Sequence, residues 1–385
     1  MVTVTPWDVV GTIDYDKLIE EFGVQKLTQD LKKRLEKHAQ KKGFPLHRHL
    51  RRNLVFAHRD LEKFLDAYEA DKPVALYTGR SPSGNIHLGH MYVWEFTKWL
   101  QDVFDCELYF QFPDEEKFLF KQELSYEEAQ KYLEENLLDV AAMGFKKEKT
   151  YFLIDTKHAN TLYPLALQVA KKITYNQVKS TFGFTDSQNI GAIFYTAMQA
   201  VPAILPSIDN GTETYVLIPH AIDQDPHFRI SRDVIKKLGY PKPASIQGRF
   251  LPGLAGQETD GKMSSSKEQT AIYSTDTASQ IKKKINKYAY SGGRETLEEH
   301  RRRGGKPEVD VAYQWLTFFL EDDKELKELH ELYTEGELLS GEMKARCIEV
   351  IQKYLQEHQT RRTTVKVNNF LYDKRKKTHD SQSKQ

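Results

Sequence analysis

The chain has 385 residues, of which 39% are hydrophobic and 29% charged, and these values are typical of a soluble globular protein with two or three domains. The formal net charge is only +1, which excludes the global basic signature of many nucleic-acid-binding proteins. The two cysteines, Cys106 and Cys347, exclude a disulfide framework and a cysteine-rich zinc site, and no apolar run approaches the ~20 residues of a membrane span, so we expect no membrane partner.

Residues 1–72 are predicted to form an N-terminal helical extension, because segments 16–22 and 61–68 carry apolar residues at helical spacing. The N-terminus has neither the apolar block of a signal peptide nor the arginines of a transit peptide, so we expect a cytoplasmic protein. Between residues 31 and 53, nine Lys or Arg residues accompany a single Glu. Such runs are most often solvated faces, and contact with RNA is the alternative interpretation.

The next region alternates strands and helices. The apolar run 74–77 has the length of a strand, and residues 91–100 form an amphipathic helical pattern after a turn rich in Gly, Ser and Pro. Further strands are predicted at 106–112, 150–154 and 215–219, and further helices after a capping box at Ser125 and over 226–238. This alternation favours an α/β fold with a Rossmann-like parallel sheet over residues 73–274, whose ligands bind at the carboxyl ends of the strands.

Two other regions are predicted to be helical. Residues 155–207 have little β character and are expected to form a helical insertion between the two halves of the sheet. Residues 275–371 are expected to form an all-α C-terminal domain. The remaining residues, 372–385, are polar and basic and are expected to be disordered.

The turn over residues 78–90 is the first candidate ligand site. A strand, a Gly-rich turn and a helix N-terminus direct free backbone N–H groups and the positive end of the helix dipole toward one point, which favours an anion. His87 and His90 lie three residues apart and therefore project toward the same ligand. Gly79 and Gly84 have the spacing of a P-loop, but the residues after Gly84 are not the Lys and Ser or Thr that a P-loop requires. An ordinary βα loop and a nucleotide site remain as interpretations.

A second motif, Gly-Lys-Met-Ser-Ser-Ser-Lys at residues 261–267, decides between them. Alone it indicates a solvated surface loop. Together with the sequence His-Leu-Gly-His at residues 87–90 it resembles the paired motifs with which class I aminoacyl-tRNA synthetases enclose ATP. The second motif matches the family pattern at four positions: Lys262, Met263, Ser264 and Ser266. Ser265 stands where the family pattern has its second lysine.

Polar residues also gather at or near the ends of the predicted strands. They are Tyr77, Gln111, Glu116, Gln199, Asp223 and Gln224. Individually such residues are more often satisfied structural groups than ligand contacts. Together they are suited to an amino acid, because a glutamate binds an ammonium group, amides bind a carboxylate, and Tyr77 and Gln111 offer hydrogen bonds to a polar side chain.

Longer segments, at residues 178–187, 217–226 and 291–294, resemble the eukaryotic-type tryptophanyl-tRNA synthetases, and the resemblance extends over nearly the whole chain. It implies a homodimer with a helical anticodon-binding domain, and L-tryptophan, ATP, Mg²⁺ and tRNA(Trp) as substrates and partners. It also implies that Tyr77 and Gln111 face the indole N–H, and that Glu116, Gln199 and Gln224 bind the amino and carboxylate groups. No metal-binding residue is predicted.

The same resemblance implies the residues that bind ATP and catalyse the reaction. The implied ATP-binding residues are Arg80, Gly84, His87, Gly89, His90, Asp223, Lys262 and Met263. The implied catalytic residues are His87, His90, Lys262, Ser264 and Ser266. Two alternatives remain, a tyrosine-specific synthetase and a catalytically silent RNA-binding homologue. Gln111 in place of a carboxylate favours tryptophan, whereas Ser265 favours the silent homologue.

Overall fold

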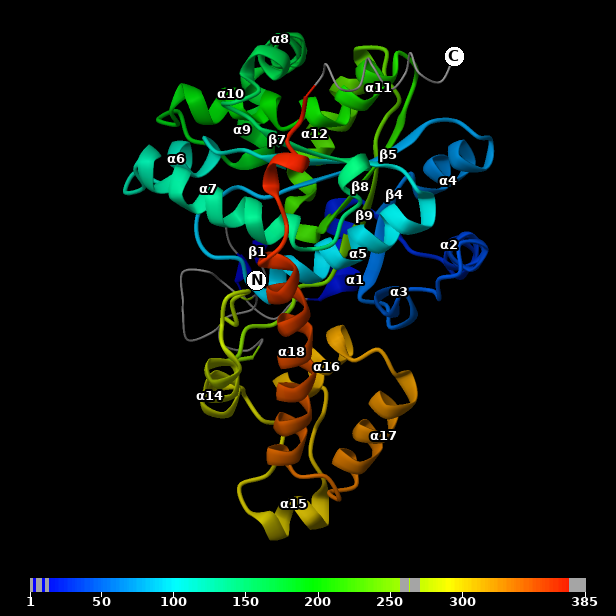
Figure 1. The fold of residues 1–385 in the computed structure, drawn as a ribbon, viewed down its shortest axis with the longest axis vertical. Helices are drawn as coiled ribbons and strands as arrows, with labels where there is room; N and C mark the ends of the chain where they lie inside the picture. Colours follow the sequence, from blue (N-terminus) through cyan, green and yellow to red (C-terminus); the bar gives the residue numbers. More distant parts are fainter. Residues whose placement is uncertain (1–2, 5–8, 11–13, 257–262, 264–270, 374–385) are drawn as a thin grey trace.

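A seven-stranded sheet lies at the centre of the structure, a computed structural model that describes residues 3–4, 9–10, 14–256, 263 and 271–373 (Figure 1). The strand order is β3-β4-β9-β8-β5-β6-β7. The strands of this sheet are β3 (Gln25–Lys26), β4 (Val55–Arg59), β5 (Val74–Gly79), β6 (Glu107–Phe112), β7 (Thr150–Ile154), β8 (Tyr215–Ala221) and β9 (Ala244–Gly248). A separate antiparallel pair is formed by β1 (Thr3–Val4) and β2 (Val9–Val10).

Helices cover both faces of the sheet and form the lower part of the molecule in Figure 1. The helices that precede or cover the sheet are α1 (Tyr15–Phe22), α2 (Gln29–Lys41), α3 (Arg48–Arg51), α4 (Leu61–Glu69), α5 (Leu88–Phe104), α6 (Glu116–Phe120), α7 (Tyr126–Ala141), α8 (Ala159–Ala170), α9 (Tyr175–Phe182), α10 (Ile190–Met198), α11 (Leu205–Asn210) and α12 (Asp225–Lys237). The C-terminal helices are α14 (Ala278–Tyr288), α15 (Leu297–Arg303), α16 (Val311–Phe319), α17 (Asp323–Thr334) and α18 (Ser340–Arg362). The 3₁₀ turns are η1 (Lys147–Lys149), η2 (Val201–Ala203), η3 (Ile222–Gln224) and η5 (Val367–Asn369).

The order of the parallel strands reverses between β5 and β8. From β5 the chain proceeds outward to β6 and β7, and then returns to form β8 on the other side of β5, with β9 beyond it. The helices α8 to α11, which span residues 159–210, make this return connection and lie above the sheet in Figure 1. Such a reversal opens a crevice at the carboxyl ends of the two central strands, where open α/β sheets bind their ligands.

The sheet separates two hydrophobic cores. On one face the sheet packs against α5, α7 and the C-terminal helices, in a core that includes Leu76, Phe110 and Trp315. On the other face Tyr77, Tyr109 and Leu153 pack against the helices that return the chain to β8. The two sets follow from the alternation of side chains along each strand, since successive residues point to opposite faces. Tyr77 is therefore directed toward the helices of the insertion.

The sheet is larger and less uniform than the sequence predicts. Residues 1–72, expected to be a helical extension, also contribute β3 and β4, and β4 pairs antiparallel with β9, so the sheet is mixed rather than purely parallel. Strand β9 was not predicted, because Ser245 and Gln247 interrupt its apolar pattern. Both are fully buried, and Gln247 Nε2 donates to Ser245 Oγ at 2.8 Å. Pairing with two neighbouring strands thus outweighs the weak local preference.

The ordered chain continues past the boundary predicted at residue 372. The backbone N–H of Tyr372 donates to the carbonyl of Phe152 at 3.0 Å, and its hydroxyl donates to Asp209 Oδ1 at 2.9 Å. Phe370 stacks on Phe152 with ring centroids 5.0 Å apart. These two aromatic residues bind the end of the chain to the edge of the sheet at β7, so Tyr372 does not belong to a disordered tail. Residues 374–385 lie outside the described residues.

One segment corrects the expectation that no run is apolar enough for a membrane span. Among the described residues, Ile190–Asn210 has the length and hydropathy of a spanning helix, but 72% of its most apolar window is buried inside the protein. The segment is divided among α10, η2 and α11, and it contributes Tyr195, Val201 and Leu205 to the core beneath the insertion. Its apolar character is explained by its place over the sheet.

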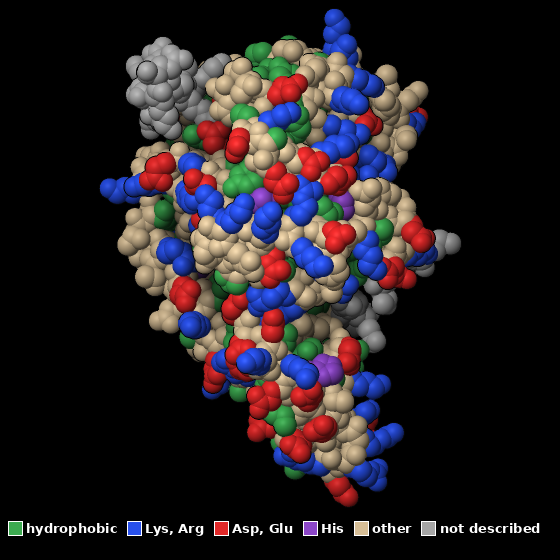
Figure 2. Space-filling model, turned by 90° about the vertical axis from the view of Figure 1, so that its right-hand side faces the viewer, with side chains coloured by type: hydrophobic (Ala, Val, Ile, Leu, Met, Phe, Trp, Pro, Cys, Tyr) green, Lys and Arg blue, Asp and Glu red, His purple; other side chains and the backbone are tan. Residues whose placement is uncertain are grey.

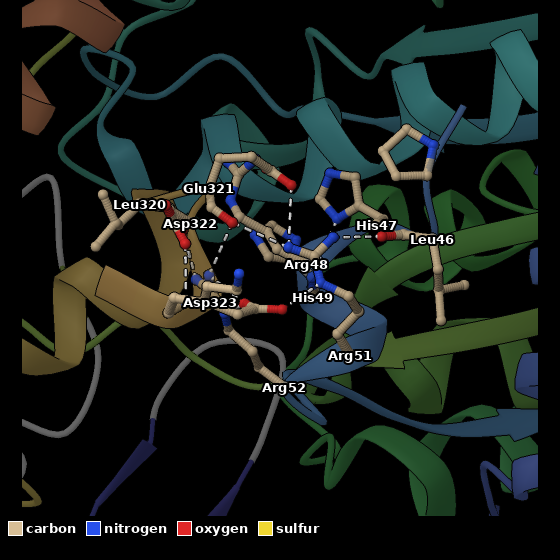
Figure 3. Close-up of polar contacts among 12 residues, drawn as sticks. Leu46, His47, Arg48, His49, Arg51, Arg52, Leu320, Glu321, Asp322 and Asp323 are labelled. Atoms are coloured by element: carbon tan, nitrogen blue, oxygen red, sulfur yellow. Dashed lines mark hydrogen bonds and ion pairs between the residues drawn. The ribbon is translucent and has the colours of Figure 1, made fainter. Parts of the chain in front are cut away.

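The basic run at residues 31–53 includes an arginine cluster that joins the sheet region to the C-terminal helices. We define this cluster as Arg48, Arg51 and Arg52 (Figure 3). Arg48 donates to both carboxylate oxygens of Glu95 on α5 at 2.6 Å, and to Glu321, which precedes α17, at 3.0 Å. The other two arginines donate through Nε to Asp323 at 2.6 and 2.7 Å. Helix α3 is therefore held between α5 and the start of α17.

The arginine cluster is paired with acidic residues of the same chain, which disfavours RNA contact as its role. Each guanidinium of the cluster is directed toward carboxylates or backbone carbonyls of this chain. Figure 2 shows Lys or Arg and Asp or Glu side chains intermingled on the side of the molecule that carries α2 and α4. The positive charge that is concentrated in the sequence is thus balanced by residues that the fold brings from distant segments.

Candidate active site

A cavity of about 480 Å³ lies at the carboxyl ends of β5 and β8, where the strand order reverses. Its walls come from the turn between β5 and α5, from α6, from the turn between β8 and α12, and from Phe250, Leu251 and Met263. The sequence-predicted residues that line it are Arg80, His87, Gly89, His90, Glu116, Asp223, Gln224 and Met263. Residues separated by more than 180 positions therefore meet in one site, at the position that the sheet topology predicts.

The two histidines cap helix α5. His87 is its N-cap residue, and its Nδ1 accepts a hydrogen bond from the backbone N–H of Gly89 at 3.1 Å. His90 Nδ1 accepts in turn from the backbone N–H of His87 at 3.3 Å. The two rings stack with their centroids 3.7 Å apart. This reciprocal capping holds both imidazoles at the positive end of the helix dipole, beside the cavity.

The second motif reaches the first through Met263. This residue is buried and lines the cavity, and its backbone N–H donates to the carbonyl of Leu251 at 3.2 Å. A Cβ atom placed on Gly89 would lie 3.5 Å from Cβ of Met263 and 3.0 Å from the ring of His87. The absence of a side chain at Gly89 thus keeps the space between the two motifs open. Lys262, Ser264 and Ser266 lie outside the described residues.

Arg80 brings positive charge into the cavity wall. Its Nε and Nη2 atoms are buried, and they make no hydrogen bond to any atom in the described part of the chain. Burial lowers the pKa of Arg80 to about 10, against the opposing charge of Glu116, so the guanidinium stays protonated at neutral pH. A buried cation with unused donors is suited to an anionic ligand. Gly84 lies nearby in sequence but outside the cavity lining, and its carbonyl accepts from Asn136 Nδ2 at 3.0 Å.

Glu116 brings the opposite charge. Burial alone would raise the pKa of this carboxyl, but the charge and hydrogen bond of Lys117, whose Nζ lies 2.8 Å from Glu116 Oε1, hold the pKa below its ordinary value. The other oxygen, Oε2, accepts from the hydroxyl of Tyr195 at 3.3 Å. Glu116 is therefore an ionised, oriented carboxylate in the cavity wall, able to bind an ammonium group.

We predict that Lys117→Met makes substrate binding at Glu116 pH-dependent. Without Lys117, burial raises the pKa of Glu116 above its ordinary value of 4.5, so KM for an amino acid bound there should rise about tenfold for each pH unit below the new pKa. In the wild type the depressed pKa keeps the carboxylate charged, so KM should not change for this reason above pH 4.5. Burial lowers the pKa of His227 to about 4, so this histidine stays neutral between pH 6 and 8, and burial also lowers the pKa of His220 below its ordinary value.

The measurement is the pH profile of KM for the amino acid between pH 6 and 8 in the wild type and in Lys117→Met, with Lys117→Arg as the control. The arginine variant retains a cation beside Glu116 and should follow the wild-type profile. Identical profiles for all three proteins would show that Lys117 does not control the charge of Glu116.

Tyr77, Gln111 and Gln199 lie behind the cavity rather than in its lining. The hydroxyl of Tyr77 donates to Gln111 Oε1 at 2.5 Å and accepts from Gln199 Nε2 at 3.2 Å. The single hydroxyl proton of Tyr195 lies between two acceptors, Gln199 Oε1 and Glu116 Oε2, so Tyr195 connects this group with the cavity. The predicted side-chain pocket and the predicted ammonium site are thus parts of one hydrogen-bonded network.

Several residues of the site were not predicted from the sequence. They are Lys117, Tyr195 and His220. Lys117 follows Glu116 directly, and its charge was the available signal. His220 lies within β8, where Nδ1 of its buried ring donates to the carbonyl of Ala221 at 2.8 Å. Tyr195 lies on α10 and reaches Glu116 across 79 positions, so no local pattern identifies it.

Comparison with known proteins gives a consistent result. The family model described as tRNA synthetases class I (W and Y) matches residues 69–356. The cytoplasmic tryptophan–tRNA ligase of Schizosaccharomyces pombe is 48% identical over 376 residues, which cover 94% of each chain. The tryptophan–tRNA ligase of Saccharolobus solfataricus is 45% identical over 96% of this chain and 95% of the relative. The crystal structure of a tryptophanyl-tRNA synthetase from Encephalitozoon cuniculi bound to tryptophan is similar with a TM-score of 0.86 at 39% identity, over 94% of this chain and 99% of that one.

Proposed function

This chain belongs to the class I tRNA synthetases of the W and Y family, and we propose that it is a tryptophan–tRNA ligase, which activates L-tryptophan with ATP and transfers it to the 3′ end of tRNA(Trp). The observation that carries the proposal is the meeting of two motifs in one cavity. Met263 of the second motif lies against Gly89 of the first, beside the stacked pair His87 and His90. The names of the relatives support tryptophan as the amino acid.

We assign ATP to the part of the cavity that carries cationic groups and the carboxylate of Asp223. The imidazoles at the start of α5 and the guanidinium of Arg80 bind phosphate oxygens, and Asp223 binds the ribose hydroxyls. We assign Lys262 to the leaving pyrophosphate, with Ser264 and Ser266 of the same sequence motif. The tryptophan carboxylate attacks the α-phosphate in line, so catalysis consists of positioning and of stabilising charge in the transition state.

We assign the amino-acid side to the network around Glu116. Its carboxylate binds the α-ammonium group of tryptophan, and Gln224 and Gln199 bind the carboxylate group. Gln111 Oε1, which already accepts from Tyr77, has a second lone pair for the indole N–H. A network built on such a hydrogen bond rejects analogues that lack the donor.

Three further properties are part of the proposal. Mg²⁺ is usually bound through substrate phosphates rather than by a protein cage, which fits a phosphate side formed by histidines and arginine. When bound it would neutralise phosphate charge. We propose a homodimer, which light scattering on the purified protein would test, and a cytoplasmic location, as in the relatives named cytoplasmic.

The test is amino-acid-dependent exchange of pyrophosphate into ATP, with tryptophan and tyrosine compared on the purified protein in the presence of Mg²⁺. We expect exchange with tryptophan and at least about 10⁴-fold less with tyrosine, since the site is built on a specific hydrogen bond. Exchange with tyrosine alone would establish the alternative specificity. No exchange with either amino acid would establish the catalytically silent homologue, with Ser265 as the first residue to restore to lysine.

A further inference from the structure

The side chain that fixes the orientation of Gln111 comes from a third strand. Asp155 directly follows β7 and is 1% exposed, and its Oδ2 accepts from Gln111 Nε2 at 2.8 Å. In the parallel register Gln111 lies beside Leu153, two residues before Asp155, so the two side chains point to the same face of the sheet. Asp155 is outside the cavity lining and has no part in the roles assigned above.

The chemistry of this contact determines which way the amide points. The Asp155 oxygen in contact with Gln111 is an acceptor, so the NH₂ group of Gln111 must face Asp155. The carbonyl oxygen Oε1 must then face Tyr77, whose hydroxyl donates to it at 2.5 Å. Gln111 is 1% exposed, so a reversed amide would place its oxygen against the accepting oxygen of Asp155, with no water to supply a donor between the two oxygens.

A second acid completes the arrangement. The carboxyl group of Glu115 interacts with that of Asp155, and Asp155 Oδ1 and Glu115 Oε2 are both buried and accept from no donor in the described part of the chain. Burial, followed by the charge of the neighbouring acid, raises the pKa of Asp155 well above its ordinary value, and burial raises that of Glu115 to about 7. The two carboxyl groups are suited to share a proton, and Oδ2 of Asp155 is the oxygen that accepts from Gln111.

We propose that Asp155 is a positioning residue for tryptophan selectivity: it holds the Gln111 amide so that Oε1 is presented as a hydrogen-bond acceptor to the substrate's indole N–H. This inference rests on the proposed function and deepens it. Asp155 acts through Gln111 and touches no substrate atom. The requirement is an acceptor at Oδ2, and the negative charge itself is not required.

The test compares Asp155→Leu with Asp155→Asn. Leucine has the same branching as aspartate but no acceptor, so it frees the Gln111 amide. Asparagine can accept from Gln111 through its oxygen and donate to Glu115 through its NH₂, so it preserves the orientation. The substrates are tryptophan and β-(3-benzothienyl)-L-alanine, in which sulfur replaces the indole N–H. The readout is kcat/KM for each in pyrophosphate exchange.

We expect Asp155→Leu to lower kcat/KM for tryptophan about tenfold, the worth of one neutral hydrogen bond, and to leave that for the benzothienyl analogue unchanged. Asp155→Asn should keep the wild-type ratio of kcat/KM for tryptophan to kcat/KM for the benzothienyl analogue. Equal losses of kcat/KM for both substrates in Asp155→Leu would leave the ratio of the two values unchanged and would mark a merely structural role. An equal fall of this ratio in the leucine and asparagine variants would also overturn the inference. If Asp155→Leu does not fold, Asp155→Ala removes the same acceptor. Failure of the proposed function is distinguishable, since the wild type would then show no exchange with tryptophan.

Discussion

Replacing Arg48 by methionine is expected to lower the free energy of unfolding by about 3 kcal/mol, near the lower end of the cost of removing one partner from a buried ion pair. The side chain of Arg48 is 8% exposed and that of Glu95 25%, so Glu95 would lose its partner where water reaches only in part. Burial lowers the pKa of Arg48, but the charges and hydrogen bonds of Glu95 and Glu321 outweigh burial and leave the pKa raised. The charged form is therefore favoured by the fold. Methionine keeps much of the aliphatic volume, so the loss should be mainly electrostatic.

Urea unfolding followed by tryptophan fluorescence would measure this difference, with Arg34→Met as the control. Arg34 on α2 also forms two ion pairs, with Asp66 and Glu69, but these partners are 66% and 40% exposed. Exposed pairs contribute at most about 1 kcal/mol, so the control should unfold close to the wild type. Equal stability of Arg48→Met and the wild type, combined with weaker binding of tRNA, would instead support RNA contact as the role of this basic run.

The arginine cluster illustrates what the sequence can and cannot predict. The concentration of positive charge before residue 53 is evident from the sequence, but its partners Glu321 and Asp323 are some 270 positions away, so the pairing becomes visible only in the fold. The central strands β5 to β8 were predictable because each contains a short apolar run that is buried in the sheet. Strand β9 was not, because the polar residues Ser245 and Gln247 interrupt its apolar pattern, and their mutual hydrogen bond is visible only in the fold.

In the candidate site, too, the sequence predicts the residues of local motifs but not the contacts between distant elements. His87, His90 and Met263 were predictable because each lies in a motif whose spacing carries information, and the fold brings them to one cavity. The hydrogen bond from Gln111 to Asp155 and that from Tyr195 to Glu116 join residues on different elements. A polar residue shows in the sequence only what it can donate or accept, whereas its role depends on which partner tertiary packing places beside it.

Arg80→Met is expected to keep the stability of the protein and to lose activity, whereas Arg48→Met is expected to lose stability. Arg80 is a buried guanidinium whose Nε and Nη2 find no acceptor in the described residues, and burial lowers its pKa to about 10. A base whose folded pKa lies below its unfolded value of 12.5 destabilises the folded state at every pH below about 10, and this penalty declines as pH rises from 10 to 12.5. Methionine removes the charge, so the variant should be at least as stable as the wild type at neutral pH.

Its activity, however, should fall steeply. If Arg80 binds the phosphates, its unused donors meet negative charge that develops in the transition state, and losing them should slow tryptophan-dependent pyrophosphate exchange by about 10²–10³-fold, or roughly 2.7–4 kcal/mol in the barrier. Arg80→Lys keeps the charge but loses the planar guanidinium, so its exchange rate should lie between those of the wild type and Arg80→Met. KM for tryptophan should change little, because Glu116 binds the ammonium group from another wall. A variant that is both less stable and fully active would place Arg80 with Arg48 among the structural arginines, and would require another cation to carry the phosphate charge.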